Sequence, residues 1–345
     1  MANLFFFLSG EHENLPTSEL KAILETEGCA YEISEKLDQI LRLSADLGCL
    51  DAVKHRAAFT RLCALELFDC DAKTTSIVKA VRSAGISNIL KKGESFAVRV
   101  KHVKTFGSNI NGMILEGKLG ALIHDSISGT KVNLKNPDKT FIGILTSDRF
   151  VFGLKLAEIA AKPFVERGPR RKPFFHPSAM QAKLARCMVN LARPKTGDLV
   201  LDPFCGTGGI LIEAAFIGCR VLGLDVQRRM ARGARKNFAH FKVEPEGVIV
   251  GDARSLPVKK IDRMVTDPPY GRSTITFKRT TAQLVQQVLV AVHSLLDKGQ
   301  RVCMAAPRTL NVETIGTALG YKHIESHFVY VHRTLTREIV VFEKV

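Results

Sequence analysis

The sequence has few features of a membrane protein or of a secreted protein. None of its apolar runs approaches the roughly 20 consecutive residues that a membrane-spanning helix needs. The apolar run at residues 4–8 has no basic leader and no small-residue cleavage site, so it is interpreted as a buried strand and not as a signal peptide. We therefore expect a protein of the cytoplasm that makes no membrane contact.

Cysteine pairs of the kind that bind zinc are also absent. The eight cysteines are scattered and none forms a Cys-x-x-Cys pair, so no metal site is expected and most are interpreted as buried thiols. Cys63 and Cys70 are close enough in sequence to be bridged, a pairing that a cytosolic protein would show mainly in a hyperthermophile. His293 and His323 have no partner at a metal-binding spacing.

Acidic residues are few relative to basic ones. The 345 residues include 50 Lys and Arg against 34 Asp and Glu, which gives a net charge of +16. The net charge is −7 over residues 1–72, +8 over residues 73–160 and +15 over residues 161–345. A solvated surface needs charge but not charge of one sign, so the last two segments favour a polyanionic partner. A basic surface without a partner is the alternative.

Two small domains are expected in the first half of the chain. Residues 1–70 combine strands with an acidic helix, which predicts an α+β domain. Residues 71–155 predict a second α+β domain, in which Phe96, Val98 and Val100 alternate with basic residues as in a half-buried strand.

The second half has a different pattern. Residues 156–177 contain four prolines and a basic cluster, and are interpreted as a linker. From residue 178 to residue 345 the chain alternates strand and helix, which predicts a doubly wound, Rossmann-like and largely parallel α/β sheet. The last two expected strands are separated only by residues 333–336, which predicts a closing antiparallel hairpin.

A glycine-rich turn follows the first strand of this sheet. Residues 202–209 read Asp-Pro-Phe-Cys-Gly-Thr-Gly-Gly, and such glycines let the backbone turn tightly and approach a ligand. A dinucleotide fingerprint fails because position 211 is Leu, and a P-loop fails because no Gly-Lys-Ser/Thr follows. The turn therefore predicts a pocket for a nucleoside ligand without a pyrophosphate, with a purely structural connection as the alternative.

Two further acids end the next two strands. Asp225 is placed to accept hydrogen bonds from ribose hydroxyls, and Asp252 could contact an adenine amino group, with Ala253 and Arg254 beside it. Either acid alone would be read as a solvated turn residue. Their order after Asp202 favours a binding site.

A third motif occurs at residues 265–272, which read Val-Thr-Asp-Pro-Pro-Tyr-Gly-Arg. Both prolines lack a backbone N–H, and the second constrains the first towards an extended conformation. Asp267 is thus expected to be held at the tip of a strand, followed at once by an aromatic ring.

With these motifs in this order, residues 174–345 resemble the class I S-adenosylmethionine-dependent methyltransferases. The sequence Asp-Pro-Pro-Tyr resembles the motif of members that methylate an exocyclic amine of a base. The resemblance implies that Asp267 and the carbonyl of Pro268 accept the protons of the amine and direct its lone pair at the sulfonium methyl. Tyr270 would stack on the base after it has left its helix, and Gly271 would let the chain turn beneath the ring.

The first half of the chain indicates which class of substrate the enzyme would act on. Residues 71–155 resemble a THUMP domain, chiefly through residues 131–145 and 150–156, and the preceding block resembles the ferredoxin-like domain that accompanies it. THUMP domains occur in RNA-modifying enzymes and are known for gripping the 3′ end of tRNA. Residues 174–192 also match the helix that precedes the glycine turn in THUMP-linked guanine N2-methyltransferases.

Taken together, the chain resembles the archaeal tRNA guanosine-10 N2-methyltransferase family. The resemblance implies S-adenosylmethionine as cofactor, tRNA as partner, and one or two methyl groups added to N2. The motifs leave open a guanosine N2 in the acceptor stem or in ribosomal RNA, an adenine N6, and a non-catalytic RNA-binding scaffold. They also leave open whether a small activating protein is needed.

The expected site residues form three groups. The catalytic group is Asp267, Pro268 and Tyr270. The cofactor group is His176, Pro177, Ser178, Asp202, Pro203, Phe204, Cys205, Gly206, Thr207, Gly208, Asp225, Val226, Asp252, Ala253, Arg254 and Asp267. The RNA group is Lys135, Lys139, Arg170, Arg171, Lys172 and Arg272. The basic residues at 228–236 fit a solvated helix face as well as RNA contact, and Phe174 and Phe175 fit linker packing as well as the pocket.

Overall fold

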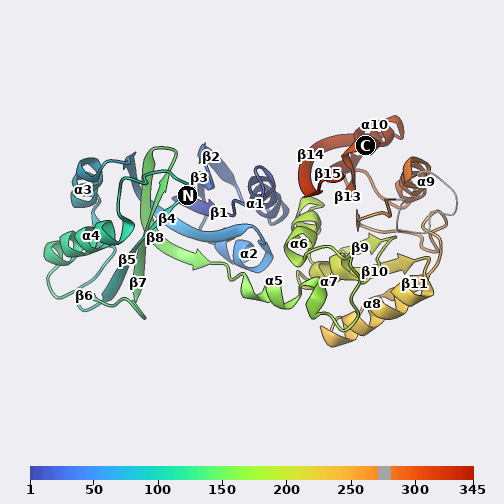
Figure 1. The fold of residues 1–345 in the computed structure, drawn as a ribbon, viewed down its shortest axis with the longest axis horizontal. Coiled ribbons are helices and arrows are strands. Elements are labelled where there is room, and N and C mark those ends of the chain that lie inside the picture. Colours follow the sequence, from blue (N-terminus) through green and yellow to red (C-terminus); the bar gives the residue numbers. More distant parts are fainter. Residues whose placement is uncertain (271–280) are drawn as a thin grey trace. The chain divides into compact units, whose positions relative to one another are not determined.

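The computed structural model describes residues 1–270 and 281–345 (Figure 1). The chain divides into two compact units. Unit 1 comprises Met1–Glu11, Cys29–Lys54 and Thr60–Ile159. Unit 2 comprises His12–Gly28, His55–Phe59 and Ala160–Val345.

Unit 1 is built on an eight-stranded sheet of order β2-β3-β1-β4-β8-β7-β5-β6. Its strands are β1 (Ala2–Leu8), β2 (Tyr31–Leu37), β3 (Ile40–Ala45), β4 (Thr60–Asp71), β5 (Ser95–His102), β6 (Lys131–Val132), β7 (Lys139–Thr146) and β8 (Arg149–Glu158). Its helices are α2 (Cys49–Arg56), whose last two residues belong to unit 2, α3 (Thr74–Ser83), the 3-10 turn η1 (Ile86–Asn88) and α4 (Gly112–Ser126).

The two small domains expected from the sequence share this one sheet. β4 carries the chain across the expected border at residue 70 and pairs antiparallel with both β1 and β8. The β7–β8 hairpin turns at Ser147 and Asp148, which have positive φ values of 47° and 59°. Phe141, Phe150 and Phe152 pack together against α3 and α4 residues in one of the cores of this unit. The division into domains at residues 70, 155 and 177 stays a prediction.

Unit 2 contains the second sheet. Its strands are β9 (Leu199–Asp202), β10 (Arg220–Asp225), β11 (Gly247–Val250), β12 (Arg263–Thr266), β13 (Arg301–Pro307), β14 (Tyr321–His332) and β15 (Leu335–Lys344). Its helices are α1 (Leu15–Thr26), α5 (Lys162–Glu166), α6 (Ala182–Leu191), α7 (Gly209–Ala215), α8 (Arg228–His240), α9 (Thr281–His293) and α10 (Val312–Ala318), with 3-10 turns η2 (Pro169–Arg171) and η3 (Arg308–Leu310).

The order of this sheet is β11-β10-β9-β12-β13-β15-β14. The strands from β11 to β13 are parallel, whereas β15 pairs antiparallel with β13 and with β14. The chain moves outward from β9 to β11 and then returns to the other side of β9 with β12. A cofactor pocket in such a sheet lies at this switch point, outside the carboxyl ends of the strands.

Both faces of the unit 2 sheet are covered, which explains why its strands read as nearly continuous apolar runs. Val200, Val265 and Cys303 point into a core shared with α1, α6, α7 and α8. The alternate residues Leu201 and Met264 point into a second core with α9 and α10. The expected doubly wound sheet and its terminal hairpin are confirmed.

Helix α1 belongs to unit 2 although 155 residues, from 27 to 181, separate it from α6 in the chain. Leu15, Ala22 and Phe59 pack in the same core as α6. The buried carboxylate of Glu19 accepts the backbone N–H of Phe59 at 2.8 Å and the side-chain amide of Asn190 at 2.9 Å. An N-terminal segment thus completes the unit that holds the glycine turn.

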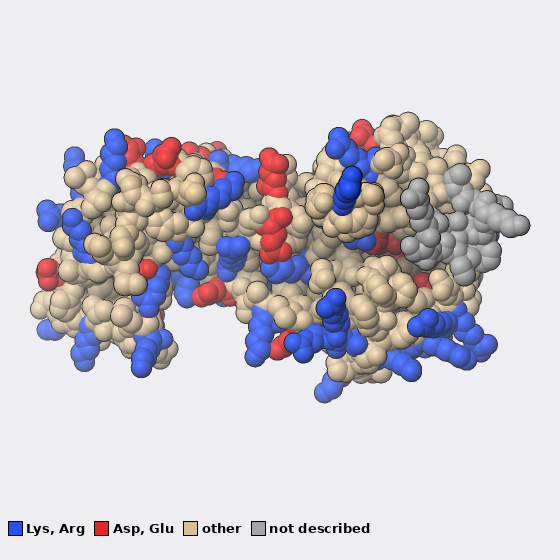
Figure 2. All heavy atoms as spheres, in the orientation of Figure 1, with Lys and Arg blue, Asp and Glu red and all other residues tan. Residues whose placement is uncertain are grey.

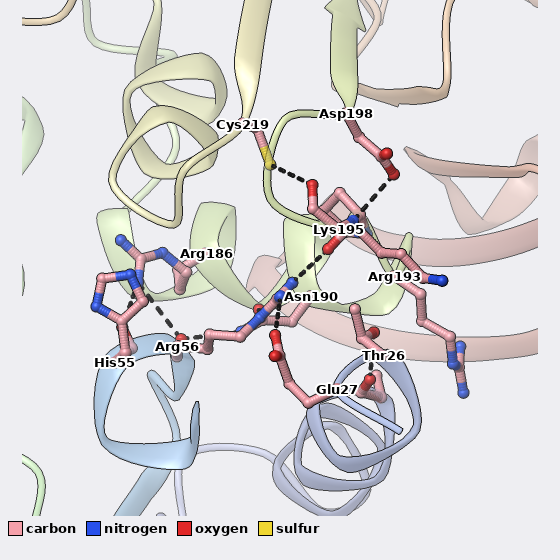
Figure 3. A network of polar contacts seen from close by, with 12 residues as sticks. Thr26, Glu27, His55, Arg56, Arg186, Asn190, Arg193, Lys195, Asp198 and Cys219 are labelled. Atoms are coloured by element: carbon pink, nitrogen blue, oxygen red, sulfur yellow. Dashed lines mark hydrogen bonds and ion pairs between the residues drawn. The ribbon is translucent and has the colours of Figure 1, made fainter. Parts of the chain in front are cut away.

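Figure 3 shows the polar contacts at the end of this packing. The buried guanidinium of Arg56 donates to Glu27 Oε1 at 2.6 Å and to the carbonyl of Pro194 at 2.8 Å. Arg186 donates to the carbonyl of His55 at 3.2 Å. These bonds join α1, residues 55–59 and α6 in one network.

One pairing considered from the sequence is excluded. Cys63 and Cys70 both lie on β4 and are free thiols, and seven extended residues separate their Cα atoms by about 23 Å. A disulfide needs Cα atoms within about 7 Å. The bridged cysteines are instead Cys29 and Cys49, whose Cα atoms are 6.1 Å apart.

Candidate active site

Four aspartates follow four neighbouring strands of the unit 2 sheet. Asp202 and Asp225 are the last residues of β9 and β10, Asp267 directly follows β12, and Asp252 follows β11 by two residues. Because these strands are parallel, all four carboxylates lie along the same edge of the sheet.

The glycine turn between β9 and α7 is held by Asp225. One carboxylate oxygen of Asp225 accepts the N–H of Gly206 at 3.0 Å, and the other accepts the N–H of Gln227 at 2.8 Å. Gly206 and Gly208 have positive φ values of 52° and 78°, which L side chains rarely adopt. A Cβ at position 208 would also lie 2.9 Å from the ring of Phe238. Positions 206 and 208 therefore require glycine.

Asp202 lies buried at the centre of this edge. It accepts the hydroxyl of Thr266 at 2.6 Å and the N–H of Phe204 at 3.0 Å. The pKa of Asp202 is raised to about 7, chiefly by burial and also by the charges of Asp267 and Asp225, against the opposing effect of its two hydrogen bonds. Three carboxylates are thus crowded together, an arrangement that a cationic ligand would relieve.

A single amide ties the segment before α6 to the glycine turn. The buried side chain of Asn237 accepts the N–H of Phe174 at 2.9 Å and donates to the carbonyls of Phe174 at 3.0 Å and Thr207 at 2.9 Å. The ring of Phe174 packs on α8 at Gly233, while Phe175 is 43% exposed. Of the two uses considered for Phe174, the structure supports packing.

The residues after Phe175 lie near the expected ribose site. His176 Nδ1 is 2.7 Å from the hydroxyl of Ser178. Burial raises the pKa of Asp225, and its backbone hydrogen bonds and the proximity of His176 lower it in part. His176 is therefore close to the carboxylate that holds the turn.

Asp267 is largely buried, with 16% of its side-chain surface exposed, and both of its oxygens face partners in the same unit. The hydroxyl of Tyr270 donates to Oδ1, and the guanidinium of Arg337 forms an ion pair with Oδ2 at 3.1 Å. Arg337 also donates to the Tyr270 hydroxyl at 3.2 Å, with its guanidinium 5.6 Å from the centre of the tyrosine ring. Burial raises the pKa of Asp267, and Arg337 and Tyr270 counteract it.

Asp252 has a close partner from its own turn. Arg254 folds back on it, with Nε 2.8 and 2.9 Å from the two carboxylate oxygens. Ala253 between them is buried. The expected contact of this turn with adenine stays a prediction.

The expected RNA-binding residues differ in exposure. Lys135, Arg170 and Arg171 are exposed, whereas Lys139 is half-buried and paired with Glu94 at 2.6 Å. Lys172 is buried, and burial lowers its pKa to about 8 although Glu213 raises it. Its side chain therefore does not lie on the exposed surface with Arg170 and Arg171, and its expected contact with RNA stays a prediction. Arg272, like Gly271, lies outside the described residues.

Helix α8 presents the largest basic face of unit 2 among the expected elements. Its outward residues are Arg228, Arg229, Arg232, Arg235 and Lys236, all exposed. Figure 2 shows basic side chains gathered over this helix, at the lower right of the view. Its buried face is apolar apart from Asn237.

Three residues of the site were missed by the sequence reasoning. Thr266 precedes the Asp-Pro-Pro-Tyr motif and hydrogen-bonds Asp202, Asn237 lies in α8, and Arg337 lies on β15. Thr266 lies within the stretch 265–272 but was given no role, Asn237 and Arg337 belong to no local motif, and Arg337 is 70 residues from Asp267. Their roles depend on which strands become neighbours.

The sheet order, the glycine turn after β9 and the proline turn after β12 define a Rossmann-like methyltransferase domain. Residues 169–337 match the family model UPF0020, described as an RMKL-like methyltransferase domain. The crystal structure of TrmN from Thermus thermophilus has the same fold, with a TM-score of 0.57 at 19% identity, over 99% of this chain and 100% of that chain.

Relatives of known name match the chain along its whole length. The tRNA (guanine(10)-N2)-dimethyltransferase of Methanothermobacter thermautotrophicus is 37% identical over 99% of each chain. The protein of the same name from Methanocaldococcus jannaschii is 32% identical, again over 99% of each. The chain belongs to the tRNA (guanine(10)-N2)-dimethyltransferase family. The expected family, fold class and class of enzyme are confirmed, and S-adenosylmethionine is the methyl donor in this family.

The structure gives two further findings about the described parts of the chain. No helix within residues 1–270 and 281–345 is long and apolar enough to cross a membrane. In the same residues no group of three or more His, Cys, Asp or Glu side chains could hold a metal ion.

Proposed function

We propose that this protein transfers methyl groups from S-adenosylmethionine to the exocyclic N2 of guanosine 10 in tRNA, first one and then a second. The observation that carries the proposal is the largely buried Asp267, held at the carboxyl end of β12 beside Asp202 in a chain of this family. The reaction would take place in the cytoplasm, where tRNA is used.

The crowded carboxylates fit the proposed cofactor. S-adenosylmethionine carries an ammonium and a sulfonium, and when bound it supplies an electrophilic methyl group. Asp225 is placed for ribose hydroxyls, because each of its oxygens keeps a lone pair besides the one that accepts a backbone N–H, and the glycines at 206 and 208 put no side chain between the turn and the ligand. Asp202 and Asp267 would lower the energy of the cationic end, with His176, Pro177 and Ser178 closing the pocket.

Asp267 and Pro268 would orient the guanine amine. An amine conjugated to a ring is a weak nucleophile, so acceptors that hold its protons direct the nitrogen lone pair and offset the charge that develops. The nitrogen would form its bond to the methyl carbon as the bond between that carbon and the sulfonium sulfur breaks. It would release one proton to Asp267, and S-adenosylhomocysteine would be the other product. The monomethylated product retains one N–H, which is sufficient for a second round.

Tyr270 would change partners when the base enters. Its hydroxyl occupies the Asp267 oxygen that the amine needs, so binding of the base would displace this contact and leave the ring to stack on the base. Arg337 would remain paired with the other oxygen and keep Asp267 ionised in a buried site.

RNA recognition would be divided between segments. Residues 71–155 would hold the 3′ end of the tRNA, with Lys135 on an exposed loop and Lys139 beside it. Arg170 and Arg171, exposed on η2, would contact phosphates, and Arg272 would follow the base-binding tyrosine.

The test is mass spectrometry of nucleosides from tRNA transcripts incubated with the protein and labelled S-adenosylmethionine. We expect N2-methylguanosine and then N2,N2-dimethylguanosine with the normal transcript, and neither with one in which adenosine replaces guanosine 10. Asp267→Asn should abolish transfer and leave the binding of S-adenosylhomocysteine, which lacks the sulfonium charge that Asp267 would face, nearly intact. Methylation of another nucleotide, or full activity of Asp267→Asn, would contradict the proposal.

A further inference from the structure

The edge strand of the unit 2 sheet exposes two aromatic side chains. Phe328 and Tyr330 on β14 are 55% and 73% exposed, and being two residues apart they point to the same face. Val329 between them points the other way and is buried in the core. Exposed neighbouring aromatics on an edge strand are a liability unless they bind something.

One cation lies over the first of these rings, and further basic residues follow in the chain. The guanidinium of Arg308, on η3, lies 4.9 Å from the centre of the Phe328 ring. His332 and Arg333 continue the exposed surface, and no acidic residue occurs between Ser326 and Arg337. Glu338, opposite Phe328 in the register, is buried and accepts a hydrogen bond from Ser326 at 2.7 Å.

The register places this surface at the same end of the sheet as the active site, on the face opposite to the one that Val329 and its partner Arg337 share. Arg337, which contacts Asp267, pairs with Pro307 on one side and with Val329 on the other. Since the order is β12-β13-β15-β14 and strands lie about 4.8 Å apart, β14 runs roughly 14 Å from β12. The aromatic residues and Asp267 lie at the same end of the sheet.

Aromatic rings interleaved with cations suit unpaired nucleotides, because each base has a face to stack and each phosphate a negative charge. A second copy of the chain is a poorer occupant. It would carry the same cationic residues to the contact, so like charges would meet.

We propose that Phe328, Tyr330 and Arg308 form a stacking surface for the nucleotides of the substrate RNA that flank the methylated guanosine; this inference rests on the proposed function. A base that leaves the helix deprives its neighbours of a stacking partner. The two rings replace that partner, and Arg308 binds the adjoining phosphate.

The experiment measures methylation kinetics on a tRNA transcript, RNA affinity against salt, and S-adenosylhomocysteine affinity. The combined Phe328→Ala, Tyr330→Ala variant should lose about tenfold or more in kcat/KM for tRNA. Its affinity for S-adenosylhomocysteine should not change. Tyr330→Phe, which keeps the ring, and Val331→Ala, which removes an exposed apolar side chain from the same strand, should stay within about twofold of the unsubstituted protein.

The salt dependence of RNA affinity distinguishes the contribution of Arg308 from that of the two aromatic rings. Arg308→Gln should reduce the slope of log affinity against log salt by about 1, whereas the aromatic variants keep the slope. Unchanged kcat/KM in the double variant, or an oligomer that the double variant disrupts, would overturn the proposed surface. If the unsubstituted protein methylated no tRNA guanosine, the proposed function would fail, and the RNA affinities would still test the surface.

Discussion

Arg337 is the single residue on which the state of Asp267 most depends. Asp267 is largely buried, and it faces Arg337 from β15, Tyr270 from its own turn, and the carboxylate of Asp202 from β9. Burial favours the protonated acid, which could not accept a proton from the amine. Arg337 favours the ionised form, so it acts as a positioning residue that also sets the charge of the site.

Replacing Arg337 by Met should raise the pKa of Asp267. The acidic limb of the kcat/KM profile should then move to higher pH, with a loss of about 10- to 100-fold at neutral pH, as expected for a charged hydrogen bond. Arg337→Lys, which keeps the charge, should retain the position of the limb. A profile that is lowered by Arg337→Met but not displaced would show that Arg337 does not control this ionisation.

At the scale of elements, helix α8 positions the segment that leads into the cofactor site. Its buried face offers Gly233 to the ring of Phe174, and Asn237 one turn later binds the backbone of Phe174 and of Thr207. A methyl group at position 233 would lie 2.0 Å from a ring carbon of Phe174. Helix α8 can pack this closely against the ring of Phe174 only because position 233 has no side chain.

Gly233→Ala should therefore destabilise unit 2 by about 1–3 kcal/mol, as overpacking does, and should also weaken S-adenosylhomocysteine binding. Gly117→Ala is the matched control, because a Cβ there meets nothing within 4 Å in the middle of α4. It should stabilise its helix by about 0.5–1 kcal/mol. Calorimetric unfolding of the two variants measures both effects, and equal effects of the same sign would contradict the steric account.

At the scale of the whole molecule, the two units are interwoven along the chain. The segments His12–Gly28 and His55–Phe59 leave unit 1 to complete unit 2. Glu19 joins these two segments to each other and to α6, since its carboxylate accepts the N–H groups of Ala58 and Phe59 and the side-chain amide of Asn190. A catalytic fragment would need residues 12–28 and 55–59 to cover the apolar side of α6.

Glu19 should make the stability of unit 2 fall as pH rises. Burial raises its pKa from 4.5 to about 7, against its hydrogen bonds, so between these values the folded protein holds a proton that the unfolded chain has lost. This stability is complete below about pH 4.5 and is lost through pH 7. The pKa of Asp202 is also raised, so Asp202 should likewise make the stability of unit 2 fall as pH rises.

The measurement is the melting temperature at pH 5 and pH 8 of the transition that S-adenosylhomocysteine raises. Glu19→Gln should reduce the difference between the two melting temperatures. The difference that remains would be the contribution of Asp202. An unchanged difference would mean that Glu19 is already ionised in the folded protein at pH 5.

The sequence by itself determined the chemistry of the site. The glycine turn, the acids at successive strand ends and the proline-held Asp267 are local patterns, because each needs only neighbouring residues to reach its conformation. The alternation of strand and helix also determined the doubly wound sheet and its hairpin, since the burial of each strand is encoded in its own side chains.

Only the tertiary structure decided which distant residues serve that site. Arg337 reaches Asp267 because β15 inserts between β13 and β14, and Lys172 is buried because its chain turns inward before α6. Helix α1 joined unit 2, and Cys29 rather than Cys63 found a bridging partner. These outcomes depend on contacts between segments far apart in sequence, where the free energy of packing selects the partner and no local pattern records it.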